Sequence, residues 1–270
     1  MKAPKPGLEA AVLVAVGLVV LVVALTQSDL SKYQDPLFPG VKMAKPATCQ
    51  WLIFQVPCDK VFTLGYATWL GSQAAYVTVS HGLNNGDGVY QPCYYDCGGE
   101  PFVGKIWDKE DPYVDAAVLK IEQRGTQASP HVEICGFNPA PTSVDGYFTD
   151  AELKSYVGGS IYSMYRIGFV TGCRGGIAQV YAYEPYTYDG QPYCLLVLQS
   201  TDQWQPTEQG DSGSPLFQIK SVYTLGNMWS IKMAGILTKV RYVDNQPAYI
   251  EFRSVDCVNR FYGVAFRYGS

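Results

Sequence analysis

The sequence predicts an all-β fold, and three observations support this prediction. Short segments rich in β-branched and aromatic residues recur along the chain after about residue 49. Clusters of Gly, Pro, Asn and Asp separate these segments, as turns between strands require. No alternation of strands and helices appears that would indicate a parallel sheet. Many short strands joined by turns are typical of an antiparallel barrel or sandwich.

The first element in the chain is an uncharged apolar segment at residues 10–25, preceded by Lys2 and Lys5. Its length is close to that of a membrane span, and slightly long for the core of a signal peptide. No clear small-x-small cleavage site follows, since Ala24-Leu25-Thr26 fits that pattern imperfectly. We therefore expect residues 1–27 to be a signal anchor, with a cleaved signal peptide as the alternative. The positive-inside rule places the rest outside the cytoplasm, either anchored to the membrane or secreted.

A polar, proline-containing stretch follows, and we interpret residues 28–57 as a linker or leader. The remainder, 58–270, is predicted to be the folded domain. Its predicted strands are 60–71, 74–81, 115–122, 175–184, 194–201, 214–220, 231–243 and 248–255. One helix is expected late in the chain, capped by Ser254, running from Val255 to Tyr262 and ending at Gly263.

Eight cysteines follow the apolar segment: Cys49, Cys58, Cys93, Cys97, Cys135, Cys173, Cys194 and Cys257. An even number in an exported chain indicates disulfides, although the sequence leaves their pairing open. The Cys93-x-x-x-Cys97 spacing resembles half a metal site, but no second cysteine pair or histidine pair completes it. We expect no metal and no organic cofactor. The net charge of −4 provides no basic surface, so nucleic acid is not an expected partner.

Ser212 lies in the hexapeptide Gly-Asp-Ser-Gly-Ser-Pro, residues 210–215. Glycines allow a tight turn that side chains would block. Such a turn can direct the N–H groups of Gly210 and Ser212 at one point, forming an oxyanion hole for acyl transfer. The alternative is a loop that uses Ser, Gly and Asp only as turn formers.

A serine nucleophile needs a nearby base and a third group that orients the base. His81 ends the alternating apolar strand AAYVTVS, whereas His131, the only other histidine, lacks such a context. Asp115 opens the apolar strand DAAVLKI, where a carboxylate can be buried enough to hold an imidazole in one tautomer. The nearby Glu110 and Asp111 precede a proline and fit better in the loop.

The three residues occur in the order His81, Asp115, Ser212, which is the order of chymotrypsin. Subtilisin-like enzymes and α/β-hydrolases use other orders, and the latter also need Gly-x-Ser-x-Gly between a strand and a helix. The sequence therefore predicts a catalytic triad of the chymotrypsin type.

Several segments in the same order resemble trypsin/chymotrypsin-type serine peptidases, nearest to the bacterial branch of streptogrisins and α-lytic protease. They are residues 63–83, 115–121, 166–180, 210–215, 233–240 and the ending SVDCVNRFYGVAF, and together they extend over about residues 58–266. The resemblance implies two six-stranded antiparallel barrels, with a break near 136–160 and a short C-terminal helix. It places His81 and Asp115 on the first barrel and Ser212 on the second. It also implies a polypeptide substrate that binds as an added strand along Leu237, Thr238 and Lys239. We expect the protein to be a monomer.

The chain departs from this family at several positions. Gly82 follows His81 where many relatives have a half-cystine, and Ser214 stands where many have glycine. The base of the specificity pocket falls near 206–208 without an Asp at its first position, so a preference for Arg or Lys is unsupported. If Val240 lines this pocket, it favours small side chains. No Ile-Val-Gly-Gly start appears that would indicate activation through a new N-terminus.

The leading hypothesis is an extracytoplasmic serine endopeptidase. The first alternative is a surface binding or structural protein that reuses the same scaffold without catalysis, since fold does not imply function. The second is an esterase that uses the same triad, because the acyl-transfer chemistry is shared.

Overall fold

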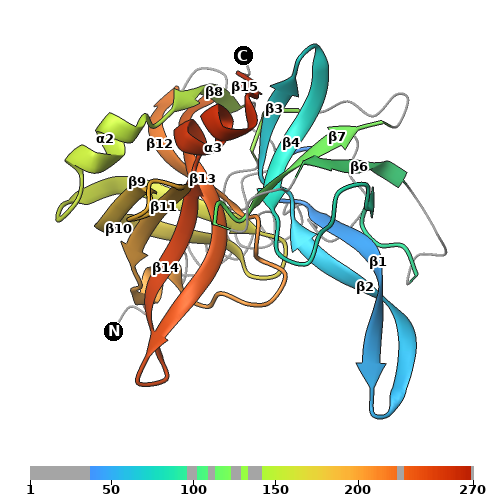
Figure 1. The fold of residues 1–270 in the computed structure, drawn as a ribbon. Helices are drawn as coiled ribbons and strands as arrows, with labels where there is room; N and C mark the ends of the chain where they lie inside the picture. The colour runs from blue at the N-terminus through green and yellow to red at the C-terminus, as the bar shows by residue number, and fades with distance from the viewer. Residues whose placement is uncertain are drawn as a thin grey trace, which may run out of the picture.

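The computed structural model describes residues 37–95, 102–108, 113–122, 129–132, 142–223 and 228–268. They form two β-sheets that lie side by side (Figure 1). The predicted anchor, residues 1–27, lies outside the described residues. Among the residues described, no helix is long and apolar enough to span a membrane.

The first sheet has eight strands in the order β15-β3-β4-β7-β6-β5-β1-β2. Its strands pair antiparallel throughout the described residues, and the edge strand β15 comes from the C-terminal end of the chain. The strands are β1 (Lys42–Trp51), β2 (Phe54–Thr63), β3 (Tyr66–Leu70), β4 (Gln73–Val79), β5 (Gly88–Tyr90), β6 (Phe102–Asp108), β7 (Ala116–Ile121) and β15 (Ala265–Phe266). A buried cluster that includes Leu64, Tyr76 and Leu119 fills its interior.

The second sheet has seven strands in the order β12-β9-β10-β11-β14-β13-β8, and β12 also pairs with β13, which closes it into a barrel. The strands are β8 (Thr142–Tyr147), β9 (Ser160–Gly168), β10 (Gly172–Tyr186), β11 (Pro192–Gln199), β12 (Pro215–Tyr223), β13 (Met228–Val243) and β14 (Gln246–Ser254). Trp204, in a 3-10 turn (Asp202–Trp204), packs with Phe252 in its core. The β8–β13 pair is parallel, which the sequence did not predict.

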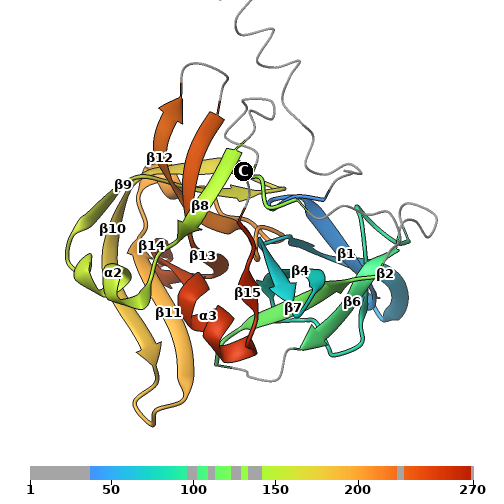
Figure 2. The same ribbon diagram turned by 90° about the horizontal axis from the view of Figure 1, so that it is seen from above.

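A third apolar cluster joins the two sheets, which Figure 2 shows side by side from above. It combines Val77 and Val118 of the first sheet with Phe217 and Ile236 of the second. The two-sheet, all-β architecture confirms the predicted fold class. The sheets have eight and seven strands instead of six each, and the short strands β15 and β8 lie at their edges.

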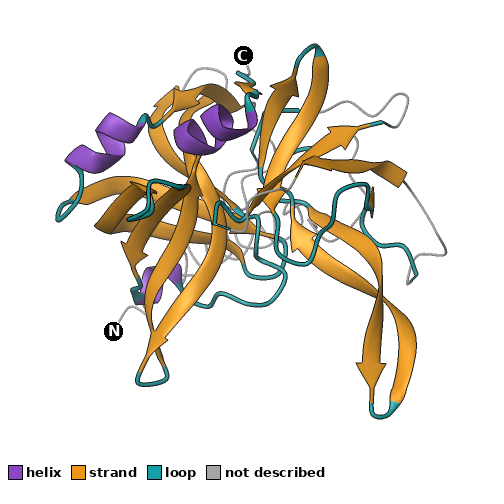
Figure 3. Ribbon diagram, viewed as in Figure 1, coloured by secondary structure: helices purple, strands orange, loops and turns teal. Residues whose placement is uncertain are grey.

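The predicted late helix is confirmed as α3 (Val255–Tyr262), which ends at Gly263 in the left-handed conformation with φ 63°. Ser254 occupies the N-cap position, but its side chain makes no capping hydrogen bond there. Its hydroxyl instead lies 3.2 Å from the Tyr183 hydroxyl. A second helix, α2 (Asp150–Ser155), begins at Thr149, and Figure 3 shows both helices on the same side of the molecule.

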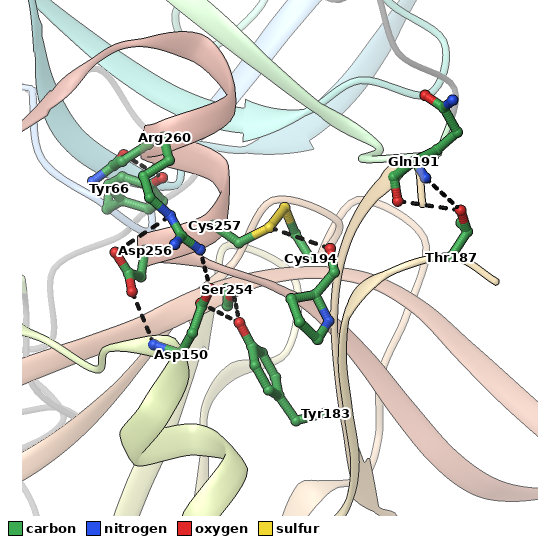
Figure 4. The surroundings of a disulfide bond; sticks show 12 residues. Tyr66, Asp150, Tyr183, Thr187, Gln191, Cys194, Ser254, Asp256, Cys257 and Arg260 are labelled. Atoms are coloured by element: carbon green, nitrogen blue, oxygen red, sulfur yellow. Dashed lines mark hydrogen bonds and ion pairs between the residues drawn. A yellow bond between two sulfur atoms is a disulfide. The ribbon is translucent and has the colours of Figure 1, made fainter. Parts of the chain in front are cut away.

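Two disulfides are described in full. Cys194–Cys257 joins β11 to α3, next to an ion pair between Arg260 and Asp150 (Figure 4). Cys49–Cys58 joins β1 to β2. Cys93 is also disulfide-bonded, so it is no thiolate ligand for a metal, and Cys173 is bonded as well. Cys97 and Cys135 lie outside the described residues.

The boundary of the folded domain differs from the one expected. Residues 42–57 of the predicted linker form β1 and the start of β2, and the first sheet includes them. Leu37 is already buried in its core. The folded domain therefore includes residues 37–57, which lie before the predicted start at 58. The second sheet begins with β8 at Thr142, inside the predicted break at 136–160.

Candidate active site

His81 and Asp115 are brought together by the pairing of β4 with β7. The two strands are antiparallel with Val79 opposite Ala116, so the residues after β4 and before β7 meet at one end of the ladder. His81 Nδ1 lies 3.0 Å from Asp115 Oδ2 and 3.2 Å from Oδ1. The His81 side chain is 51% exposed, whereas that of Asp115 is 20% exposed.

Asp115 adopts a left-handed backbone conformation, φ 44°, which Asp tolerates better than most residues. Its Oδ1 also accepts hydrogen bonds from the Ser80 hydroxyl and the His81 backbone N–H, each at 3.0 Å. A carboxylate only accepts, so Nδ1 carries the proton in the His81–Asp115 hydrogen bond. Nε2 is then the acceptor nitrogen of the ring, as a general base requires.

The loop that carries Ser212 needs its glycines. Gly210 and Gly213 have φ +105° and +94°, which side chains rarely permit. A Cβ on Gly213 would lie 2.0 Å from the Thr63 carbonyl oxygen. The backbone of the first sheet thus passes directly against this loop.

Hydrogen bonds tie the loop to the strand that leads to His81. The Thr63 N–H donates to the Ser212 carbonyl and the Thr63 hydroxyl to the Gly210 carbonyl, both at 2.8 Å. The hydroxyl of Thr78, in β4 shortly before His81, donates to the Thr63 carbonyl at 2.9 Å. These bonds hold the serine loop beside the end of β4.

The backbone N–H groups of Gly210 and Ser212 donate to no acceptor within the described part of the chain. The other N–H groups of residues 211–214 all donate to backbone carbonyls. The two predicted oxyanion donors are therefore the N–H groups left for a ligand oxygen in this turn. Ser212 itself is half-buried.

A buried ion pair lies beneath the loop. Arg166, in β9, and Asp211 are both fully buried, with Nη1 3.5 Å from Oδ2. The Thr171 hydroxyl donates to Asp211 at 2.6 Å. Burial lowers the pKa of Arg166 to about 10, partly opposed by Asp211, so the guanidinium stays charged at neutral pH. A Cβ on Gly168 would lie 2.2 Å from Asp211 Oδ1, so this glycine makes room for the carboxylate.

Arg166 also fixes the segment predicted as the pocket base, residues 206–208. Its Nη2 donates to the Pro206 carbonyl at 2.6 Å and to the Thr207 hydroxyl at 3.0 Å. The Glu208 N–H donates to Asp211 at 3.1 Å. The predicted pocket base and the serine loop therefore share one buried network.

The predicted substrate-binding residues lie in β13. Leu237 and Thr238 are buried, and Lys239 is exposed. Leu237 exchanges backbone hydrogen bonds with Gly213 and Ser214, which ties this strand to the serine loop. Pairing of β13 with β12 stops at Ile236, whereas pairing with β14 continues to Val243. In the described residues, one edge of β13 beyond Leu237 thus has no neighbouring strand.

Sequence reasoning missed the residues that support the site. Arg166 falls in an apolar strand, and its partner Asp211 is distant in sequence, so no local pattern could pair them. Arg253, in β14, was also missed. It is buried, lies 4.8 Å from the Tyr193 ring and is attracted by the charge of Asp115. The Ser80 hydroxyl next to His81 was the one local signal available.

The fold is shared with solved serine proteases. Thermobifida fusca Protease A is 17% identical, with a TM-score of 0.54, and the match covers 86% of this chain and 98% of that one. A glutamic acid specific serine protease, described as using a histidine triad in substrate binding, is 15% identical with a TM-score of 0.55, over 86% and 100%. Cellulomonas bogoriensis chymotrypsin is 16% identical with a TM-score of 0.51, over 87% and 99%.

These likenesses show a chymotrypsin-like fold, as the sequence motifs had indicated. No protein-family model matches the chain, and no curated protein does.

Proposed function

We propose that the chain is a serine endopeptidase that acts outside the cytoplasm, with His81, Asp115 and Ser212 as its catalytic triad. The observation that carries this proposal is the joint geometry of two features. The first is the imidazole of His81, just after β4, which Asp115 orients. The second is the Ser212 turn, which is hydrogen-bonded to the adjacent strand through Thr63 and has two backbone N–H groups without an acceptor among the described residues.

In the proposed mechanism, the Ser212 hydroxyl attacks the substrate carbonyl carbon and transfers its proton to His81 Nε2. The N–H groups of Gly210 and Ser212 stabilise the oxyanion. The C–N bond then breaks, the leaving amine takes the proton from His81, and an acyl-enzyme remains. Water hydrolyses this ester in the same way. Asp115 orients His81 and stabilises the imidazolium.

We further propose that substrate adds as a strand along Thr238 and Lys239, supported by the open edge of β13. Residues 10–25 are proposed as a membrane anchor, with a cleaved signal peptide as the alternative. The disulfides support an oxidising compartment outside the cytoplasm.

A fluorophosphonate probe tests the nucleophile. We expect the full-length protein to be labelled at Ser212, as mapped by mass spectrometry, and Ser212→Ala to abolish labelling. Peptide hydrolysis should fall by about 10⁶-fold in the same variant. A folded protein that resists the probe from neutral to alkaline pH would favour the non-catalytic scaffold. A protein that hydrolyses esters but no peptide in a broad library would favour the esterase.

A further inference from the structure

The end of the β1–β2 hairpin carries four consecutive large apolar side chains, which we call the hairpin tip. Their exposed fractions are 64% for Trp51, 74% for Leu52, 86% for Ile53 and 58% for Phe54. Figure 1 shows the hairpin extending away from the rest of the fold. Isolated exposed apolar residues are ordinary, but a contiguous group of this kind marks an interaction site.

The backbone conformation at the hairpin tip is unfavourable for one of the residues found there. Trp51 and Phe54 form the last cross-strand pair, so Leu52 and Ile53 make the turn. Leu52 has φ 55°, a conformation that turns of this length usually assign to Gly, Asn or Asp. A residue held in an unfavourable conformation is a reason to look for function.

The amino-acid composition of the outer part of the hairpin, residues 46–58, is compatible with an apolar phase. Residues 46–58 carry no charged side chain. The nearest charged residues on either strand are already engaged, since Lys45 pairs with Asp87 and Asp59 accepts the Tyr94 N–H at 2.9 Å. Residues 48–55 are all exposed, and successive side chains of a strand point to opposite faces. Apolar side chains that are exposed on both faces of the hairpin can all be buried if an apolar phase surrounds the tip. A groove on a partner protein would cover only one face.

The hairpin is also built to hold its shape. The register is continuous from Lys42 opposite Thr63 to Trp51 opposite Phe54, and the Cys49–Cys58 disulfide joins the strands close to the tip. Only the turn can enter lipid without burying the open strand edges, whose backbone groups would lose their water. Any insertion is therefore shallow.

The apolar segment at residues 10–25 indicates that the apolar phase near the hairpin is a lipid bilayer. Leu37 is fixed in the first sheet, where its carbonyl accepts hydrogen bonds from the Tyr76 hydroxyl and the Ser129 N–H. Residues 26–36 can reach at most about 40 Å when fully extended. If the apolar segment is held in a bilayer, the domain stays within reach of that bilayer.

We propose that the hairpin tip inserts into the lipid bilayer surface that holds the N-terminal segment, at the boundary between headgroups and acyl chains. Trp51 and Phe54 are residue types that favour this boundary, and Leu52 and Ile53 enter furthest. The inference rests on the membrane anchoring proposed above. With two attachment points, the domain takes a fixed orientation to the membrane.

Depth-dependent quenching of tryptophan fluorescence tests this proposal. Full-length protein is placed in phosphatidylcholine vesicles with nitroxide labels either near the headgroup or deep in the acyl chains. The Trp51 contribution is the difference between the wild type and Trp51→Phe. We expect the shallow label to quench on the order of half of this contribution, and the deep label less. Trp107→Phe is the matched control, because Trp107 is an exposed tryptophan of the same sheet outside the hairpin.

A second variant, Leu52→Ser/Ile53→Ser, should lose most of the Trp51 quenching but keep fluorophosphonate labelling of Ser212. Trp51 quenched no more than Trp107 would overturn the proposal. The Trp51 emission could instead shift to the blue in vesicles while the nitroxide labels do not quench it. That result would also overturn the proposal and would indicate that a second copy of the chain or another protein covers the tip. Protein that does not float with vesicles contradicts both the anchor and the tip. Absent serine labelling with intact Trp51 quenching contradicts the peptidase alone.

Discussion

The histidine side and the serine side of the proposed site are held in different ways. His81 is half-exposed and depends on one carboxylate, which three donors orient. The serine loop lies on a fully buried ion pair between Arg166 and Asp211, which also bonds to the neighbouring pocket segment. The first arrangement leaves an imidazole free to exchange protons, and the second fixes backbone N–H groups in space.

On the histidine side, a substitution can abolish catalysis with little loss of stability. On the serine side, loss of the buried ion pair should reduce stability as well. Removing the His81 side chain leaves the Asp115 carboxylate 20% exposed and still hydrogen-bonded to the Ser80 hydroxyl and to the backbone N–H of residue 81. Removing Arg166 leaves the Asp211 carboxylate buried beneath the nucleophile without its counter-ion. Substitutions on the two sides, and one on the exposed surface, should therefore differ in what they cost.

His81→Ala should lower kcat/KM for a peptide substrate by about 10⁶-fold, because the general base is lost. The melting temperature should change little, since the side chain is half-exposed. Steady-state kinetics and thermal unfolding measure the two effects on the same sample. A large loss of stability would contradict the separation proposed for this side.

Arg166→Met should destabilise the fold by about 3–5 kcal/mol, because a buried carboxylate loses its partner. Urea unfolding measures the change. Arg166→Met/Asp211→Asn should recover part of the loss, since the variant buries no lone charge. If the single variant unfolds with wild-type stability, the ion pair does not support the serine loop.

Gly168→Ala should slow fluorophosphonate labelling by about 10²-fold, because the new Cβ displaces Asp211 and with it the neighbouring Ser212. Gly146→Ala is the matched control, since a Cβ there meets no atom within 4 Å. Equal labelling rates in both variants would show that the position of Asp211 does not control the nucleophile.

Glu152→Gln should have the smallest effect and provides a reference from the exposed surface. Burial raises the pKa of Glu152, but hydrogen bonds from Lys232 and Thr149 outweigh it and hold the pKa below its ordinary value. The carboxylate therefore stabilises the fold above the ordinary carboxyl pKa, and this contribution is lost as pH falls through the lowered value. At neutral pH we expect a loss of only about 0.5 kcal/mol, since the side chain is 43% exposed. Urea unfolding at neutral and acidic pH should show the difference between variant and wild type disappear in acid.

The sequence was sufficient for the parts of the site that local patterns encode. The order of His81, Asp115 and Ser212 and the glycines of the serine loop follow from motif and turn chemistry. The helix Val255–Tyr262 follows from its end at Gly263. These features depend on residues close together in the chain.

The remaining features depend on contacts between distant residues. The ion pair of Arg166 and Asp211 forms only when β9 packs beneath the serine loop. The strand β1 was interpreted as linker because it lies in a polar, proline-containing stretch, and Pro46 is one of its residues. Beyond its base, this strand pairs with β2 alone among the described residues, which leaves one edge open there, where a proline is tolerated. The helix α2 was predictable, since Thr149 and Glu152 have the spacing of a capping box.

The ion pair beneath Ser212 has a consequence for timing. Because Arg166 comes from within the second barrel, the positive charge is in place as soon as that barrel closes. No later cut is needed to create a charged chain end for Asp211. If Ser212 acts as proposed, folding of the second barrel alone supplies the counter-ion that the serine loop needs.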